Sequence, residues 1–143
     1  MMEFDLDNIP TSARRNVNLN IGTLPDATPL DMRLEVVRGL EDGPVCLICG
    51  CIHGDELNGF EIIRRVVDLL QPDKLKGTVV AAPIVNVFGF LHESRYLPDR
   101  RDLNRVFPGR KRGSQASRLA YDFFHAVVEK CDLGIDLHTG PLG

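Results

Sequence analysis

Residues 45–65 of this chain read V-C-L-I-C-G-C-I-H-G-D-E-L-N-G-F-E-I-I-R-R, and the fold of the whole sequence can be inferred outward from them. An apolar run ends at Ile52, His53 and Glu56 follow, and apolar residues then recur at helical spacing. A buried strand that leads into a helix through a turn at Gly54 accounts for this order. His53 and Glu56 then lie at the carboxyl end of the strand, where open α/β sheets place ligand sites.

This pair of side chains points to a metal. Imidazole nitrogen and carboxylate oxygen both bind zinc, and a catalytic zinc commonly takes two histidines, one glutamate and a water. A second histidine at the end of another strand would complete the set, and residues 134–140 (G-I-D-L-H-T-G) supply one. Asp55 or Asp136 is placed to accept the free imidazole N–H of a ligand and orient its ring. The sequence predicts one zinc ion per chain with three ligands: His53, Glu56 and His138.

Apolar periodicity predicts the other elements. The predicted strands are residues 14–21, 30–37, 45–52, 77–85 and 131–137. The predicted helices are residues 55–70 and 114–130. The first two strands form a hairpin, a turn at residues 41–44 leads into the core strand, and the last three strands read as buried. Strands that alternate with helices favour an α/β fold: a mainly parallel, mixed central sheet with helices on both faces.

The composition describes one globular domain over residues 1–143, with residues 1–13 as a loosely ordered lead-in. Hydrophobic residues make up 43% and charged residues 26%, which is ordinary for such a domain. A net charge of −3 argues against a general nucleic-acid binder. No apolar run approaches the roughly 20 residues that span a membrane. The acidic N-terminus lacks the order of a signal peptide, so we expect a cytoplasmic protein.

Three of the four cysteines, Cys46, Cys49 and Cys51, crowd into the predicted core strand. Cys46 and Cys49 have the C-x2-C spacing of a zinc site, but no second pair follows, and structural zinc pairs prefer exposed turns. We therefore interpret the cysteines as small buried side chains with reduced thiols.

The long segment 86–112 is predicted to be mostly loop, and loops of this length are usually functional. Its second part contains two acids and seven cations: Arg95, Arg100, Arg101, Arg105, Arg110, Lys111 and Arg112. Arginine binds carboxylates through two parallel hydrogen bonds, and Asn104 adds a donor. This pattern predicts a small anionic substrate. His92 and His125 lack partners at a recognisable spacing and are interpreted as structural.

A zinc with an open position beside arginines is typical of a hydrolase. The metal polarises a carbonyl and activates water, a carboxylate accepts the proton of the water, and arginines stabilise the developing oxyanion. Glu61 and Glu93 carry no context that would mark either as the general base. The sequence alone therefore assigns no residue to that role.

Three segments together resemble a known family: residues 50–56 (G-C-I-H-G-D-E), 102–105 (D-L-N-R) and 136–140 (D-L-H-T-G). Over residues 40–143 the chain is similar to the succinylglutamate desuccinylase/aspartoacylase family, a branch of the zinc carboxypeptidase-like hydrolases. The resemblance implies zinc on the three predicted ligands. It implies that Asn104 and Arg105 bind the substrate carboxylate and that an earlier arginine polarises the scissile carbonyl. Arg95 matches that arginine best, with two alternatives: Arg100 and Arg101.

The resemblance also implies a function, hydrolysis of the amide of an N-acyl amino acid. In the family, the general-base glutamate and a C-terminal β domain follow the third zinc ligand, and neither is in this chain. We therefore expect a zinc-dependent amidohydrolase (deacylase), or its zinc-binding N-terminal portion. The alternatives are a metallocarboxypeptidase acting on peptides and a non-catalytic zinc- and anion-binding module. A sheet ending at residues 131–137 would expose an edge, which leaves homo-oligomerisation open.

Overall fold

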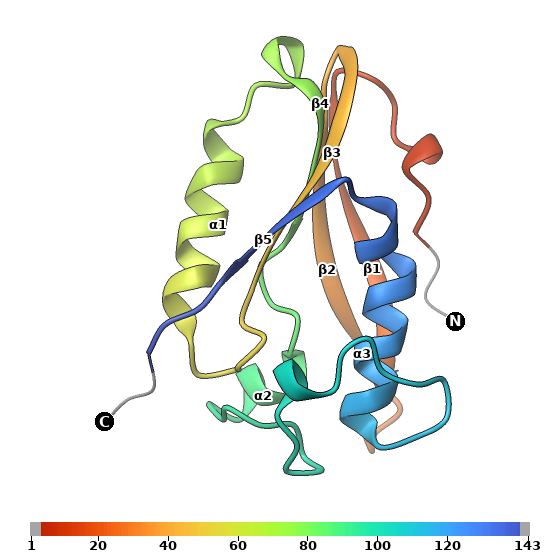
Figure 1. The fold of residues 1–143 in the computed structure, drawn as a ribbon, viewed down its shortest axis with the longest axis vertical. Helices are drawn as coiled ribbons and strands as arrows, with labels where there is room; N and C mark the ends of the chain where they lie inside the picture. The colour runs from red at the N-terminus through yellow and green to blue at the C-terminus, as the bar shows by residue number, and fades with distance from the viewer. Residues whose placement is uncertain (1–3, 141–143) are drawn as a thin grey trace.

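A twisted five-stranded sheet forms the centre of the protein in the computed structural model, which describes residues 4–140 (Figure 1). The strand order is β1-β2-β4-β3-β5. The strands are β1 (Ala13–Thr23), β2 (Pro29–Arg38), β3 (Glu41–Gly50), β4 (Lys76–Ala82) and β5 (Leu133–Leu137). β1 and β2 form an antiparallel hairpin, β2 pairs antiparallel with β4, and β3 runs parallel to β4 and β5. The predicted mixed α/β sheet is confirmed.

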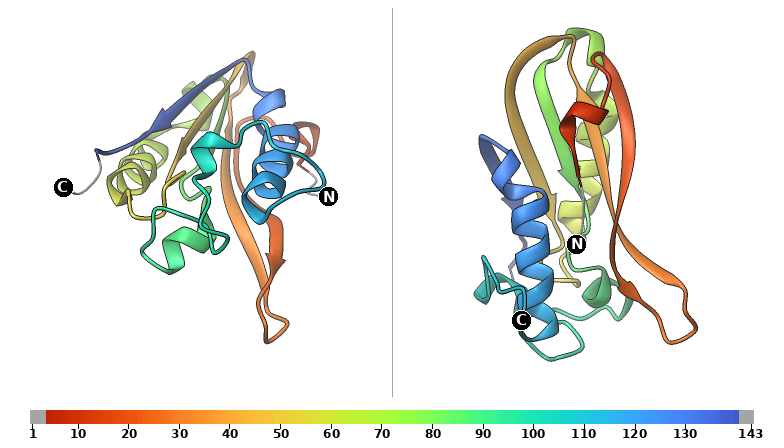
Figure 2. Two further views of the ribbon diagram at one scale, coloured as in Figure 1. Left: turned by 60° about the horizontal axis from the view of Figure 1, so that its bottom comes forward. Right: turned by 90° about the vertical axis from the view of Figure 1, so that its right-hand side faces the viewer.

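Helices cover both faces of this sheet, as predicted (Figure 2). The helix α1 (Leu57–Leu69) packs Ile63 and Val67 against one face. The helix α3 (Gln115–Ala126) packs Phe123 against the other face, where the larger part of the core lies. A short helix α2 (Val87–Leu91) lies at the end of the sheet where β3 and β4 finish (Figure 1). Single 3₁₀ turns complete the described elements: η1 (Leu6–Asn8), η2 (Pro72–Lys74), η3 (Leu103–Arg105) and η4 (Val128–Lys130).

The beginning of the chain is packed more tightly than the sequence predicts. Residues 1–13 were predicted to be a loosely ordered lead-in, and in the part of this segment that the structure describes Phe4 and Ile9 are buried. The Arg38 guanidinium donates to the carbonyl oxygens of Leu6 and Ile9 at 3.0 and 2.8 Å. Phe4, Leu6 and Ile9 are three apolar residues in a run too short to give a clear periodic signal, so the sequence pattern could not reveal this contact.

The core strand begins earlier than predicted. Residues 41–44 are the first part of β3 rather than a turn, with an irregular register between Glu41 and Val45. Gly43 approaches Gly77 of the next strand so closely that a Cβ on Gly43 would lie 2.9 Å from the Gly77 nitrogen. Gly43 therefore allows the two strands to approach closely. The residues Glu41-Asp42-Gly43-Pro44 are also typical of a turn, so the sequence alone does not distinguish the two roles.

The last strand was predicted to be buried, and the structure corrects this. Leu133 and Ile135 of β5 are 47% and 48% exposed. Within residues 4–140, β5 pairs with β3 alone and forms one edge of the sheet, so its apolar side chains have fewer neighbours than those of β3. The predicted helix over residues 114–130 also ends early, at Ala126, and continues as the turn η4. No helix of the described residues is both long and apolar enough to cross a membrane.

Candidate metal centre

The loop between β3 and α1 places two of the predicted ligands. After Gly50 the chain turns through Cys51, which has a positive φ of 48°, and the Glu56 N–H donates to the His53 carbonyl oxygen at 3.2 Å. Gly54 packs against α2, where a Cβ would lie 2.1 Å from the Gly89 carbonyl carbon. His53 and Glu56 are 2% and 4% exposed. Both side chains are therefore fixed at the carboxyl end of β3.

The pairing of β3 with β5 brings the third predicted ligand to the same point. Gly50 lies opposite Leu137, so His138 follows directly beside the β3–α1 loop. The Glu56 carboxylate lies between the two rings, with Oε1 2.9 Å from His53 Nδ1 and Oε2 2.9 Å from His138 Nδ1. The Thr139 N–H donates to Glu56 Oε2 at 3.1 Å. One ligand atom from each of the three predicted residues lies within 4.8 Å of the others.

Two further carboxylates hold the outer edges of the rings. His53 Nε2 lies 2.9 Å from Asp102 Oδ1, and His138 Nε2 lies 2.8 Å from Asp136 Oδ2. Donation from each Nε2–H leaves Nδ1 facing Glu56 and free to bind a cation. Of the two residues predicted for this role, Asp136 contacts a ligand histidine, His138. The partner of His53 is Asp102 and not the predicted Asp55.

Sequence reasoning missed Asp102 as a partner of His53, although a local signal exists. Asp102 Oδ1 also accepts the Asn104 N–H at 2.9 Å and caps the turn η3. A D-x-N sequence that opens a turn fixes the carboxylate direction. The loop then carries that carboxylate to His53, 49 residues away in the sequence.

The charges of the site reinforce one another. Burial acts to raise the pKa of Glu56, but the Thr139 N–H and the two imidazoles outweigh it, and the pKa is lowered. The pKa of Asp102 is likewise lowered, because the hydrogen bond and charge of His53 outweigh burial. Burial acts to lower the pKa of His138, but Asp136 and Glu56 outweigh it, and the pKa is raised. The site therefore favours positive charge between its carboxylates.

This donor set fits a divalent metal ion. Two imidazole nitrogens and a carboxylate oxygen form a typical three-residue zinc set that leaves a position open. With neutral imidazoles, three carboxylates (Glu56, Asp102 and Asp136) against the Arg95 guanidinium leave an excess of two negative charges, which Zn²⁺ would balance. Zinc sites also commonly hold each ligand histidine by a carboxylate at its other ring nitrogen, as Asp102 and Asp136 do here.

Of the three candidate arginines, Arg95 lies at this cluster. Its guanidinium donates to Glu56 Oε1 at 3.2 Å and lies 3.5 Å from Asp102 Oδ2. The fully buried Asn86 fixes the loop, because its side chain accepts the Gly89 N–H at 2.8 Å and donates to the Arg95 carbonyl oxygen at 3.5 Å. Arg101 instead lines a separate cavity with Arg110, Ser114 and Ser117.

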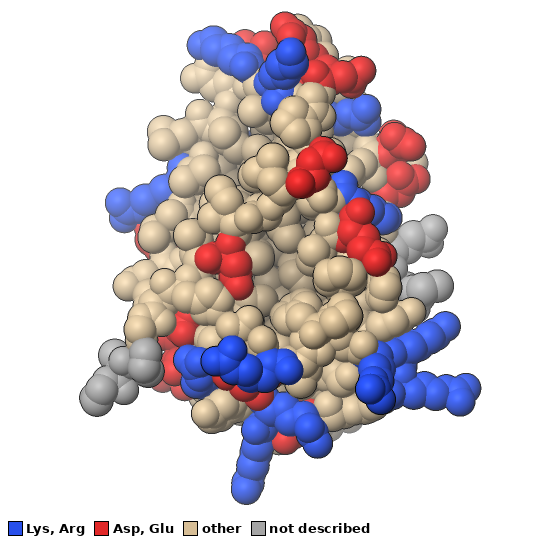
Figure 3. Space-filling view, viewed as in Figure 1, with Lys and Arg blue, Asp and Glu red and all other residues tan. Residues whose placement is uncertain are grey.

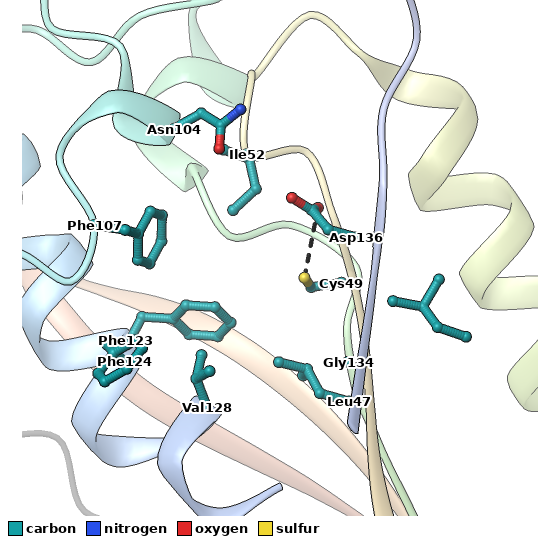
Figure 4. A pocket seen from close by; sticks show the side chains of 11 residues that line it. Leu47, Cys49, Ile52, Asn104, Phe107, Phe123, Phe124, Val128, Gly134 and Asp136 are labelled. Carbon is teal, nitrogen blue, oxygen red and sulfur yellow. Dashed lines mark hydrogen bonds between the residues drawn. The ribbon is translucent and has the colours of Figure 1, made fainter. Parts of the chain in front are cut away.

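Asn104 and Arg105, predicted to bind a substrate carboxylate, are exposed residues of the turn η3. Asn104 lies beside Asp102 and lines a cavity of about 360 Å³ together with Cys49 and Asp136 (Figure 4). Lys and Arg side chains gather at the same end of the molecule, over α2 and the loop that follows it (Figure 3). The structure thus puts both residues on the turn that Asp102 caps, and their binding role remains a prediction.

The remaining histidines lie apart from the cluster, and the cysteines are not among its three proposed metal ligands. His92 contacts the Phe88 carbonyl oxygen, and His125 contacts Glu129 on the surface of α3. All four cysteines are free thiols, two of them buried and two half-buried. The group of metal-binding side chains in residues 4–140 is the predicted one and includes none of these cysteines.

The fold and the cluster together define an α/β domain with a candidate metal centre at its strand ends. The profile of the Succinylglutamate desuccinylase/Aspartoacylase catalytic domain matches residues 42–143, so the chain belongs to this family. The chain is 34% identical over 106 residues to N-alpha-acetyl-L-2,4-diaminobutyric acid deacetylase of Halomonas elongata. That match covers 73% of this chain and 30% of the deacetylase.

Solved structures of relatives share the fold. A succinylglutamate desuccinylase/aspartoacylase from Rhodobacter sphaeroides has a TM-score of 0.84 at 27% identity, and the match covers 96% of this chain and 43% of that one. An aspartoacylase family protein from Mesorhizobium loti has a TM-score of 0.80 at 31% identity, covering 96% and 43%. The product-bound Ectoine utilization protein EutE (DoeB) from Ruegeria pomeroyi has a TM-score of 0.77 at 27% identity, covering 93% and 42%. The chain spans less than half the length of these relatives.

Proposed function

We propose that this chain is the zinc-binding portion of an amidohydrolase that releases the acyl group from an N-acyl amino acid. One observation carries the proposal: His53, Glu56 and His138 converge in a chain whose family includes a named deacetylase. Residues 1–143 would form the N-terminal portion of the catalytic domain, in line with coverage of 43% of a solved relative. The deacetylase, and the Lys and Arg side chains that gather at the end of the molecule over α2, support the substrate class.

The side chains of the site divide the work of such a reaction. His53, Glu56 and His138 would hold the zinc, which when bound polarises a carbonyl group and lowers the pKa of water. Asp102 and Asp136 keep the two imidazole rings aimed at one point by accepting their Nε2–H bonds.

The polar residues on the loop would handle the substrate. Arg95 places its guanidinium beside the cluster, where it would stabilise negative charge that develops on the carbonyl oxygen of the amide. Asn104 and Arg105, on the neighbouring turn, would bind the carboxylate of the amino acid through charge-assisted hydrogen bonds. The proposal gives no general-base role to the three carboxylates at the cluster, because each is hydrogen-bonded to an imidazole.

Elemental analysis of the purified chain tests the metal. We expect about one zinc per chain and loss of that zinc in the His138→Ala variant, because the two remaining ligands would hold the metal more weakly than three. The exposed His125→Ala variant is the matched control and should keep its zinc. Absence of zinc from the unsubstituted chain after zinc titration would contradict the proposal.

A non-catalytic zinc- and anion-binding module is the second candidate. It is favoured by the engagement of Glu56, Asp102 and Asp136 with imidazoles, which leaves proton transfer unassigned. Assay of the zinc-loaded chain with N-acetyl amino acids beside short peptides tests for turnover. Release of a free amino acid from the acetylated substrate would exclude the non-catalytic module. Binding without turnover would fit both the module and a zinc-binding portion whose general base is unassigned. Cleavage of peptides would indicate a carboxypeptidase.

A further inference from the structure

A buried thiol lies directly behind the candidate metal centre. The register of the parallel strands pairs Cys49 of β3 with Asp136 of β5. Their side chains point toward one another, and Cys49 Sγ donates to Asp136 Oδ1 at 3.5 Å (Figure 4). Cys49 is 6% exposed and lies at the edge of the apolar cavity lined by Leu47 and Phe123.

The carboxylate that receives this bond is the one that orients His138. Asp136 Oδ1 faces Cys49, and Asp136 Oδ2 lies 2.8 Å from His138 Nε2. Donors on both oxygens fix the plane of the carboxylate, whereas a single donor would leave it free to rotate. A continuous series of hydrogen bonds therefore runs from Cys49 through Asp136 and His138 to Glu56.

The environment keeps this thiol in its donor form. Burial raises the pKa of Cys49 well above the ordinary value, and the charge of Asp136 raises it further. A protonated thiol is a weak donor, and in a site of low dielectric constant it still favours one orientation of a charged acceptor. The neighbouring Cys46 thiol differs, because it donates to the Leu47 carbonyl oxygen at 3.7 Å.

We propose that Cys49 is a positioning residue of the metal centre: its thiol holds the Asp136 carboxylate in the orientation that aims His138 at the zinc. The inference rests on the proposed zinc site and adds a residue to it. Cys49 is not one of the three proposed zinc ligands, so in this inference it acts through Asp136.

Zinc affinity of the 143-residue chain, measured by competition with a chromophoric chelator, tests the proposal. Cys49→Val removes the donor at nearly constant volume, and Cys49→Ser keeps a donor. Loss of a direct partner of a metal ligand typically weakens metal binding about 10–100-fold. Cys49 acts one step further away, so we expect roughly 3–10-fold weaker binding for Cys49→Val. Cys49→Ser should stay within about two-fold of the unsubstituted chain.

A double-mutant cycle separates positioning from packing. In an Asp136→Asn background the orienting carboxylate is absent, so adding Cys49→Val should change the zinc affinity no further. Cys46→Val is the matched control on the same strand and should leave zinc binding unchanged. If Cys49→Val fails to fold by circular dichroism, Cys49→Ala removes the same donor with a smaller side chain.

Three results decide the matter. Equal zinc affinity of the unsubstituted chain and Cys49→Val would overturn the inference and leave the proposed zinc site intact. An equal loss in Cys49→Ser and Cys49→Val would also overturn it, because a packing role would then explain both. Failure of the unsubstituted chain to bind zinc would instead overturn the proposed function on which the inference rests.

Discussion

At the scale of single residues, each imidazole of the cluster lies between two carboxylates. His53 lies between Glu56 and Asp102, and His138 lies between Glu56 and Asp136. Glu56 is common to both rings, so the inner carboxylate sets their separation, with ring centroids 5.1 Å apart. The outer carboxylates set the direction of each Nδ1, which is the atom that would bind a metal.

Removal of the charge of Asp102 should weaken zinc binding. Asp102→Asn keeps a hydrogen-bond acceptor for His53 but loses the negative charge that holds both His53 and Arg95. We expect a loss of zinc affinity of about 10–100-fold, measured by chelator competition. Asp73→Asn, on the exposed turn η2, is the control. An unchanged affinity in Asp102→Asn would show that His53 is oriented by other contacts.

The pH dependence of stability follows from the direction of two pKa shifts. The pKa of His138 is raised by Asp136 and Glu56 against the opposing effect of burial. This histidine therefore stabilises the metal-free fold fully below its unfolded pKa of about 6.5, and the contribution is lost as the pH rises through the higher folded value. The pKa of Glu56 is lowered, so its contribution is present above about pH 4.3 and is lost as the pH falls through the lower folded value.

We expect the metal-free chain to lose stability above about pH 6.5, while its zinc affinity rises over the same range because the ligand must lose a proton. Urea unfolding at several pH values measures the first effect, and zinc titration measures the second. The His138→Gln variant should lose less stability on going to high pH than the unsubstituted chain. The same decline in both proteins would assign the effect to other groups.

At the scale of elements, the sequence predicted most strands and helices and the meeting point of the three ligands. It succeeded where periodicity and strand ends carry the information, as for His53 at the end of β3 and His138 at the end of β5. It failed for Asp102, because the direction of a loop carboxylate depends on how segment 86–112 crosses the strand ends. The exposure of β5 was missed for a related reason: an apolar pattern shows preference for burial and does not show which neighbours are present.

The β3–α1 loop depends on close contact with α2. A Cβ on Gly54 would lie 2.1 Å from the Gly89 carbonyl carbon and 2.2 Å from the Phe90 nitrogen, so backbone must move to accept it. Gly54→Ala should lower the free energy of unfolding by about 1–3 kcal/mol. It should also weaken zinc binding, because the loop carries His53 and Glu56. Gly140→Ala is the control, since a Cβ there meets no atom within 4 Å. Unchanged stability by urea unfolding would show that the β3–α1 loop and α2 can separate without cost.

At the scale of the whole molecule, the candidate site joins segments that are far apart in the sequence. His138 and Glu56 are separated by 82 residues, and the hydrogen bond between His53 and Asp102 links residues 49 apart. The site therefore forms only when β5 has paired with β3 and the loop after α2 has folded over the strand ends. A ligand that requires all of these segments stabilises the whole fold rather than one element.

Zinc should therefore raise the thermal stability of the entire chain. At free zinc about 100 times the dissociation constant, binding to the folded state alone contributes about 2.7 kcal/mol. For a chain of this size, that corresponds to a rise in Tm on the order of 5–10 °C. Differential scanning calorimetry with zinc, and then with excess chelator, should show the rise and its reversal. His138→Ala should show no comparable rise, because it lacks the ligand at the end of β5. The β3–α1 loop with its two ligands is unchanged in this variant. An equal rise in that variant would mean that zinc stabilises the fold from a different site, and the three-residue cluster would lose its role in metal binding.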